Sequence, residues 1–496
     1  MAFETIANFT KAAYPAQSIS TGQLTRLLGD WRRGSTRGST HRRLTDAVRS
    51  LVLDARLPLG TRLPAERPLA VSLRVSRTTV SAAYGLLREE GFLRSRTGAG
   101  SWVTMPPGRW RRGAPWGPAV ADTPDWLDLA VAAPEAGPEI LVAVAEATTM
   151  LPGYLRGHGY DPRGLALLRE EVARHYCARG LPTTPQEVLI TNGAQQGLDL
   201  VIRALVSALD PVVVDCPSYP GALDALARAQ TRLIPVSMGP GGFDTEALVG
   251  ALRRGLPRLA YLMPDFHNPT GHLMPEATRQ AVVEAARASA TCLVVDETFA
   301  DLALDDVGLP PPLAGCGTQA TVLSLGSMSK IFWAGLRVGW VRGDPGLLAR
   351  LAEARGLVDM ASPTLEQLVA ARLLARGPEL FPARRHLLRA RRDFLVGALA
   401  EHLPNWRLRI PAGGLSLWID LGAPLSTPLV AAAEGQLLRL GGGPRFGPPG
   451  TLERFLRLPF TLPEPQLRDA VERLATAWDE VAVGRNPSSL GPVQIA

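Results

Sequence analysis

The sequence predicts an α/β protein in two parts: a small module of three helices and a β-hairpin, then a large domain on a mostly parallel sheet with helices on both faces. Apolar residues at helical spacing, followed by two short strand-like runs, fill residues 40–105. From 125 to 485, short apolar runs alternate with helical stretches, as in parallel strands joined by crossover helices. A segment rich in proline and glycine, 106–124, separates the two parts as a linker. Residues 1–39 are an N-terminal extension and 486–496 a tail.

The composition is that of a globular protein, with 46% hydrophobic and 20% charged residues among 496. The formal net charge of +7 fits a partner that carries phosphates, and it also fits plain solubility. No apolar stretch approaches the roughly 18 residues of a membrane span, and no secretory signal is present, so we expect a cytoplasmic protein. We predict no metal site, and we expect the unpaired cysteines to be reduced core residues: Cys177, Cys216, Cys292 and Cys316.

Helical spacing predicts three helices in the small module. The first covers 44–55 and is ended by Pro58 and Gly60, and a short second helix follows at 65–71. Ser76 is a good N-cap for the third helix, which Gly91 ends. The apolar face of this third helix consists of Val80, Ala83, Tyr84 and Leu87.

A β-hairpin is predicted after these helices, because the runs 92–96 and 101–104 flank the sequence T-G-A-G. Three helices and a hairpin in this order make a winged helix-turn-helix, whose third helix presents its first turn to base edges in the major groove of DNA. That turn contains Arg77, which can bind guanine or phosphate, and the hydroxyls of Thr78 and Thr79, which suit phosphates. The alternative is a small appendage whose charges are only solvated.

The motifs G-T-R-L-P-A-E-R, V-S-R-T-T-V, L-R-E-E-G-F-L and G-A-G-S-W-V resemble the GntR-type winged-helix domain over roughly residues 40–105. Several separate segments agree in order and spacing, and no single one of them would suffice. The resemblance implies double-stranded DNA as a partner. It also implies DNA contacts for Arg67, Ser76, Arg77, Thr78, Thr79, Thr97 and Gly98.

Lys330 is the most informative residue of the large domain. Only two of the 53 basic side chains are lysine, Lys11 and Lys330. An amine can be deprotonated and used as a nucleophile, whereas a guanidinium stays protonated. Lys330 follows the apolar run 321–325, and the carboxyl end of a strand is where an α/β sheet presents its chemistry. An ordinary solvated lysine is the alternative.

Polar residues cluster after several other apolar runs of the large domain. The turn that contains Gly193, Ala194 and Gln195 opens a helix, whose free N–H groups would hold a phosphate. Asp296 ends the apolar run L-V-V-D, where a carboxylate needs a cationic partner such as a protonated pyridine nitrogen. Further candidates are Tyr219 as a plate for a flat ring, Asn268 for a ring hydroxyl, and Ser327 and Arg337 for the phosphate.

The motifs G-A-Q-Q, P-S-Y-P, N-P-T-G, the strand-end aspartate, S-M-S-K and G-L-R-V-G-W resemble, in this chain order, the fold-type I aminotransferases over residues 125–485. The resemblance implies a smaller C-terminal subdomain and pyridoxal 5′-phosphate held by Lys330 as a Schiff base. It implies that Asp296, Asn268 and Tyr219 contact the cofactor ring. It also implies that the phosphate is bound by Gly193, Ala194, Gln195, Ser327 and Arg337. The run R-F-L-R-L-P-F resembles the strand whose arginine binds a substrate carboxylate, which implies that role for Arg457; a surface salt bridge is its alternative.

Two positions depart from the aminotransferase pattern. Phe299 stands where D-x-x-Y has a tyrosine, which removes one hydrogen bond to the ring oxygen. Ala194 stands where a serine or threonine hydroxyl is common in the phosphate loop. Both changes favour a sensor over an enzyme.

A winged helix joined to an aminotransferase fold resembles the MocR/GabR/PdxR regulators. The resemblance implies a transcription regulator that senses pyridoxal phosphate or an amino compound, and a head-to-tail homodimer in which each winged helix reaches the other subunit. The first alternative is an active aminotransferase with an accessory DNA-binding module. The second is a repressor that has lost the cofactor and keeps the fold as a dimerisation scaffold.

Overall fold

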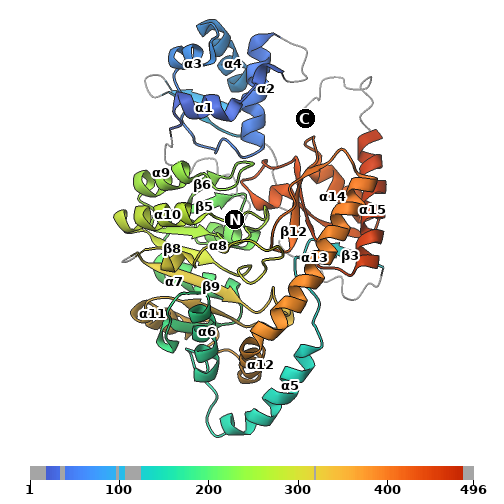
Figure 1. Ribbon diagram of the computed structural model, residues 1–496. Coiled ribbons are helices and arrows are strands. Elements are labelled where there is room, and N and C mark those ends of the chain that lie inside the picture. Colours follow the sequence, from blue (N-terminus) through green and yellow to red (C-terminus); the bar gives the residue numbers. More distant parts are fainter. Residues whose placement is uncertain (1–17, 34–38, 97–99, 107–124, 318–319, 484–496) are drawn as a thin grey trace.

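The computed structural model describes residues 18–33, 39–96, 100–106, 125–317 and 320–483. The small module sits at one end of the large domain, and the large domain carries a second, smaller sheet layer beside its main sheet (Figure 1). Lys11, Thr97, Gly98, the tail and most of the linker lie outside the described residues, and so do the predictions made for them.

The small module is a winged helix with its own buried core. Its helices pack through apolar side chains from every element, among them Leu24, Leu44, Leu69, Val80 and Leu87, all 0% exposed. The two strands pair antiparallel, as the hairpin prediction requires. In chain order the elements are α1 (Thr21–Leu28), η2 (Trp31–Arg33), α2 (Thr40–Leu53), α3 (Glu66–Leu73), α4 (Arg77–Glu89), β1 (Leu93–Arg96) and β2 (Gly100–Val103).

Two details of the small module differ from the sequence prediction. Helix α2 ends at Leu53 and does not reach Ala55, because Ala55 adopts a left-handed conformation with φ +55°. Helix α1 was not predicted, and it lies within the stretch assigned to the N-terminal extension. Its Leu24 and Leu28 belong to the winged-helix core, so residues 18–33 fold with the small module.

The main sheet of the large domain has seven strands in the order β4-β10-β9-β8-β7-β5-β6. All neighbouring pairs are parallel except those of β10, which runs antiparallel to both of its neighbours. The apolar runs 321–325 and L-V-V-D correspond to β9 and β8, while β6 and β10 were not predicted. The strands are β4 (Val188–Thr191), β5 (Pro211–Cys216), β6 (Arg232–Ser237), β7 (Leu259–Leu262), β8 (Cys292–Asp296), β9 (Val322–Ser327) and β10 (Gly339–Arg342).

Helices cover both faces of this sheet, as predicted. Leu198, Leu223 and Leu348, from three different helices, join one buried cluster, and Leu252 and Val282 join the cluster on the opposite face. The helices and short 3-10 turns of this region are α5 (Glu139–Met150), η4 (Leu151–Tyr154), α6 (Ala166–Ala178), η5 (Pro185–Glu187), α7 (Ala194–Leu205), α8 (Pro220–Arg228), α9 (Thr245–Gly255), α10 (Glu276–Ala288), η6 (Leu313–Gly315), η7 (Ala334–Leu336), α11 (Pro345–Arg355) and α12 (Thr364–Ala375).

A smaller subdomain follows, built on a second sheet in the order β11-β12-β14-β13-β3. Strand β3 comes from the start of the large domain and pairs parallel with β13, which ties residues 127–129 to the C-terminal third. The elements are β3 (Leu127–Leu129), α13 (Gly377–His402), β11 (Arg407–Leu408), β12 (Ser416–Asp420), α14 (Ser426–Gly435), β13 (Leu438–Gly442), η8 (Gly443–Phe446), β14 (Phe455–Pro459) and α15 (Glu464–Val483).

The cysteine prediction is correct only in part. None of the four thiols forms a disulfide, and Cys216 and Cys292 are buried. Cys177 is exposed because it lies in the last turn of α6 on the outside of the domain, so it is not a core residue. Within the described ranges, no helix is long and apolar enough to cross a membrane. The same ranges contain no group of three His, Cys, Asp or Glu side chains that could hold a metal ion.

Candidate cofactor site and DNA interface

Lys330 lies three residues beyond β9, between the main sheet and the second sheet. Its Nζ donates a hydrogen bond of 2.9 Å to the carbonyl of Ala132, just after β3. Burial first, and then the nearby Arg457 and Arg337, lower the pKa of Lys330 to about 8 against the opposing effect of Asp296. A substantial share of the amine is therefore neutral near physiological pH, which is what a carbonyl-attacking nucleophile requires.

The residues predicted to bind a phosphate meet at the first turn of α7. Gly193 caps this helix with φ +85°, a conformation that favours glycine. A Cβ at Gly193 would lie 3.0 Å from Nη2 of Arg337, so only glycine lets the guanidinium approach so closely. Arg337 also donates 3.1 Å to the carbonyl of Asn192, and Gln195 reaches the carbonyl of Gly221 at 3.3 Å. Ser327 is buried, and its Oγ donates to Ser329 and to Val338 at 2.9 and 3.4 Å.

The residues predicted to contact a ring lie close to the lysine. Asp296 at the end of β8 accepts 2.6 Å from the hydroxyl of Tyr261 and 3.0 Å from the amide of Thr298. Burial raises the pKa of Tyr219, and the smaller electrostatic contributions come from neighbours that include Asp296 and two arginines of the site. Asn268 is 8% exposed and its Oδ1 accepts a long hydrogen bond, 3.4 Å, from Arg457.

Arg457 in β14 is buried, with 6% of its surface exposed, and among the residues that the structure describes no carboxylate side chain pairs with it. Its Nη2 donates to the carbonyl of Ala130, its Nε has no partner, and its guanidinium carbon lies 5.0 Å from the ring centre of Phe446. Burial lowers its pKa to about 10, and the nearby Arg445 adds to this. A surface salt bridge, the alternative for this residue, does not describe it. A buried cation with a free donor suits an incoming carboxylate.

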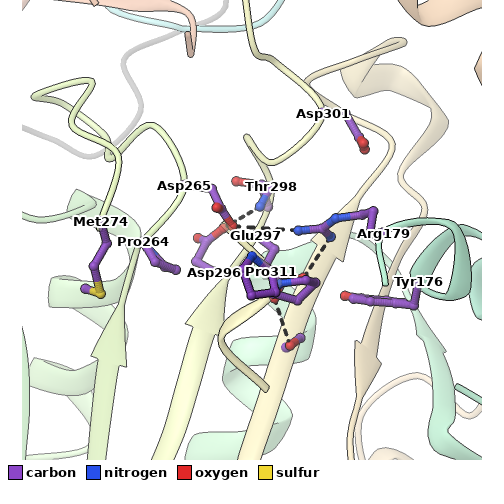
Figure 2. Close-up of polar contacts among 12 residues, drawn as sticks. Tyr176, Arg179, Pro264, Asp265, Met274, Asp296, Glu297, Thr298, Asp301 and Pro311 are labelled. Carbon is purple, nitrogen blue, oxygen red and sulfur yellow. Dashed lines mark hydrogen bonds and ion pairs between the residues drawn. The ribbon is translucent and has the colours of Figure 1, made fainter. Parts of the chain in front are cut away.

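A buried ion network lies behind Asp296 and was not predicted (Figure 2). Arg179, the residue after α6, pairs with Glu297 at 3.0 Å and approaches Asp265 at 3.8 Å. Glu297 also accepts 3.1 Å from Ser324, and Asp265 accepts 2.7 Å from Arg279. These contacts hold Glu297, the residue after Asp296, against strand β9 and the C-terminus of α6.

At both positions that depart from the aminotransferase pattern, the structure has no side-chain hydroxyl. Phe299 is 5% exposed and belongs to the buried core of the subdomain interface, where it supplies no hydroxyl. Ala194 opens α7 with a methyl group in the phosphate turn. The nearest hydroxyl bonded to Asp296 comes from Tyr261, which points from the neighbouring strand β7.

Two of the predicted DNA-contacting residues that the structure describes lie on one exposed face of the winged helix. Arg67 and Arg77 line a hollow of about 700 Å³ between α3, α4 and the hairpin, together with Arg62, which was not predicted. Ser76 caps α4 by accepting 3.1 Å from the amide of Thr79. The hydroxyl of Thr78 lies 2.7 Å from that of Ser76, so the first turn of the recognition helix is rigid.

Sequence reasoning missed Tyr261, the Arg179 network, Arg62 and the position of Phe446. Tyr261 sits in an apolar strand, where a tyrosine gives no signal beyond packing. Arg179 follows α6 more than a hundred residues before Glu297, so only the fold brings them together. Arg62 was visible within the G-T-R-L-P motif and could have been named from it.

Comparison with known proteins agrees with both parts. The family of bacterial regulatory proteins, gntR family, matches residues 40–103, and the family aminotransferase class I and II matches residues 124–474. The chain therefore has a DNA-binding helix-turn-helix module followed by an aminotransferase fold, whose cofactor is pyridoxal phosphate.

Regulators with this architecture are among the relatives. The HTH-type pyridoxine biosynthesis transcriptional regulator PdxR of Corynebacterium glutamicum is 30% identical over 75% of this chain and 81% of its own length. The probable rhizopine catabolism regulatory protein MocR of Rhizobium meliloti is 28% identical over 82% of this chain and 86% of its own. Among solved structures, the α-aminoadipate aminotransferase LysN of Thermus thermophilus matches with a TM-score of 0.65 and 31% identity, covering 73% of this chain and 94% of that one. This chain belongs to the MocR/PdxR-type regulators of the GntR family.

Proposed function

We propose that this regulator carries pyridoxal phosphate on Lys330 and that the cofactor, or an amino compound that takes the place of Lys330 on it, alters DNA binding by the winged helix. The observation that supports this most strongly is the buried amine itself. Its pKa is lowered to about 8, and the groups that act on this pKa include Asp296, Arg337 and Arg457, the residues a phosphorylated pyridine with an amino-acid partner requires. We infer a sensor in the cytoplasm that responds either to vitamin B6 or to an amine.

The residues of the site fit this cofactor. The turn Gly193-Ala194-Gln195 offers amides at a helix N-terminus to the phosphate, and Ser327 and Arg337 add a hydroxyl and a guanidinium. When bound, the cofactor supplies an electron-withdrawing ring. Asp296 would pair with a protonated ring nitrogen, and Tyr261 fixes that carboxylate with its 2.6 Å hydrogen bond. Asn268 and Tyr219 orient the ring by its oxygen and its face.

Arg457 is proposed to bind the carboxylate of an amino-acid effector. Its guanidinium has an unused Nε donor and only long or carbonyl partners, so a carboxylate would gain a two-pronged contact. This specifies an effector with an amino group for the cofactor and an acid group for Arg457. A cofactor-only signal would leave Arg457 unused.

The reader is proposed to place α4 in the major groove, with Arg77 and the hydroxyls of Thr78 and Thr79 at the bases and phosphates. Arg67 and Arg62 flank the hollow beside it. Thr97 and Gly98 stay predictions for the wing. Arg77 is 73% exposed on its side chain and pairs only at 3.4 Å with Glu66, so it is free to turn toward DNA.

We further propose a homodimer. Large apolar side chains are exposed on α5, just after η4 and just after α11: Leu141, Leu155 and Leu357 are 76%, 68% and 94% exposed. Helix α5 projects from the end of the large domain opposite the winged helix (Figure 1). A second copy of this chain would cover these groups and bring two readers to paired DNA half-sites. In this single chain, the winged helix packs on its own large domain.

The rival function is a working aminotransferase, favoured by the similarity to LysN and by the complete set of lysine, aspartate and arginine. The absence of a hydroxyl at Phe299 and Ala194 favours the sensor. The scaffold alternative requires a site that no longer reacts with the cofactor.

The test is reduction of the purified full-length protein with borohydride after incubation with pyridoxal phosphate, followed by peptide mapping. We expect visible absorbance before reduction and the phosphopyridoxyl mass on the peptide that contains Lys330. A protein that stays colourless would support the scaffold alternative. Selection of bound DNA from a random-sequence pool then separates regulator from enzyme, because an enzyme with a vestigial module enriches no sequence and turns over amino and keto acids continuously.

A further inference from the structure

One of the contacts between the winged helix and the large domain lies at the C-terminus of α2; another joins Gln23 of α1 to Glu246 of α9 at 3.0 Å. The backbone carbonyl of Leu53 accepts a 2.6 Å hydrogen bond from the amide of Leu452, and the carbonyl of Ala55 accepts from the hydroxyl of Ser237. Asp54, between them, lies 3.8 Å from Arg454. Leu53, the last residue of the helix, and the two residues after it are therefore held by the other domain.

Ala55 is buried, at 5% exposure, in a cluster that belongs to the large domain. We call this cluster the docking seat. It consists of Cys216, Phe446 and Leu452, with Trp418 and Phe455 packed against it. The seat is thus the apolar surface on which the DNA reader rests.

The docking seat is also part of the candidate cofactor site. The ring centre of Phe446 lies 5.0 Å from the guanidinium carbon of Arg457, a cation–π contact. The carbonyl of Phe446 accepts 2.7 Å from the amide of Ser218, the residue before Tyr219. Phe446 therefore contacts Arg457, the residue proposed to bind a carboxylate, through its ring. Its backbone contacts the segment that carries Tyr219, the residue proposed to stack on the cofactor ring.

We propose that Phe446 is a positioning residue that couples Arg457 to the docked winged helix, so that a carboxylate on Arg457 weakens docking and releases the reader. This rests on the proposed function, which assigns a carboxylate to Arg457. A carboxylate accepts hydrogen bonds from two N–H groups of the guanidinium. The guanidinium then moves away from the Phe446 ring and the Ala130 carbonyl. The ring then loses its cationic partner and repacks in the seat on which Ala55 rests. By linkage, release of the reader must in turn change the affinity for the carboxylate.

The amide of Leu452 is a built-in reporter of docking, because its only described backbone acceptor is Leu53 in the other domain. Hydrogen–deuterium exchange of the full-length, pyridoxal-phosphate-loaded protein measures it without any identified effector. We expect exchange in the peptide that contains Leu452 to rise about three- to thirtyfold in Arg457→Gln, as loss of one cation–π contact implies. The amide of Leu63, bonded to Ser101 within the winged helix, should be unchanged.

The matched control is Arg468→Gln, which removes a guanidinium lying at the same 5.0 Å from another ring, Phe394, on exposed α15. Arg457→Lys keeps a cation over the ring and should return exchange toward the wild-type rate. If Arg457→Gln exchanges at Leu452 as slowly as Arg468→Gln, Phe446 does not couple the sites. Phe446→Leu provides the second variant: it should raise the same exchange even where Arg457→Gln does not fold, and no increase would overturn the proposal.

A second measurement changes the winged helix and records its affinity for DNA. Ala55→Gln places a larger side chain in the seat, and Ser50→Gln makes the same change on the exposed side of α2. With the DNA selected above, the affinities of wild type, Ala55→Gln, Arg457→Gln and the double variant form a cycle. We expect Ala55→Gln to abolish the effect of Arg457→Gln, and Ser50→Gln to leave it whole. Additive effects contradict coupling, whereas absence of any DNA binding by wild type contradicts the proposed function itself.

Discussion

The pKa of Lys330 predicts the pH dependence with which the protein captures its cofactor. An ordinary lysine has a pKa of about 10.5, so only about 0.03% of it is neutral at pH 7. Burial and the neighbouring Arg457 and Arg337 lower the value for Lys330 to about 8, against the opposing effect of Asp296. About 9% is then neutral at pH 7, an increase of roughly 300-fold in the reactive form.

The assay is the second-order rate of Schiff-base formation between cofactor-free protein and pyridoxal phosphate, followed by stopped-flow absorbance from pH 6 to 10. N-acetyl-lysine methylamide under the same conditions is the control for the titrations of the cofactor itself. The ratio of the protein rate to the control rate should be constant below a pH of about 8 and should fall above it. Above that pH the amine of Lys330 is already neutral, whereas the neutral share of the control amine still grows. Below that pH the amine is increasingly protonated, so the rate falls as pH falls.

Two results would refute the reasoning. A protein rate that climbs in parallel with the control up to pH 10 means that the amine of Lys330 is an ordinary one. A bend that stays at the same pH in Arg457→Gln means that the neighbouring charge has no influence, because removal of a cation should raise the pKa of Lys330 and move the bend upward.

Three further predictions follow from the geometry. Arg77→Ala should weaken binding to the selected DNA about five- to hundredfold in fluorescence anisotropy while the cofactor absorbance stays unchanged. Phe299→Tyr should raise the rate of single-turnover transamination with an amino-acid panel, because it adds a hydroxyl beside the proposed ring oxygen; an unchanged rate would mean that this position does not govern the chemistry. Arg179→Met should lower the free energy of unfolding in urea by about 3–5 kcal/mol, since Glu297 and Asp265 lose a buried partner.

Matched variants sharpen these tests. Arg468→Ala removes an exposed arginine far from the reader and should leave DNA binding intact, so an equal loss in both variants would point to net charge alone. Arg203→Met breaks an exposed i,i+4 pair with Asp199 on α7, and should cost no more than about 1 kcal/mol. Equal destabilisation by the two variants would mean that the network of Figure 2 contributes nothing special.

Much of the fold was predictable because the strands are uniformly buried. The runs at 188–191, 212–214 and 292–296 are apolar on both faces, as strands covered by two helix layers must be. Lys330 and Asp296 could be placed together from sequence alone, since the carboxyl ends of parallel strands meet at one edge. Strand β10 was not predicted because it is only four residues long and no turn motif marks its ends. Its antiparallel direction depends on the neighbouring strands of the sheet.

The contacts that sequence could not give are those between distant segments. Tyr261 bonds Asp296 only because β7 and β8 are neighbours in the sheet. Phe446 lies in a short 3-10 turn with no periodicity, yet it joins Arg457 to the winged helix. Helix α1 is short and follows no strong apolar run, so only packing against the winged-helix core reveals its place.

The central claim is that a cofactor on Lys330 governs DNA binding. The most direct measurement is the affinity of the full-length protein for its selected DNA, with and without pyridoxal phosphate, in the wild type and in Lys330→Ala. Coupling between two sites of a protein is typically worth about five- to 150-fold. The account predicts a change of this size in the wild type and none in Lys330→Ala. The same change in both proteins, or no change in either, would contradict it.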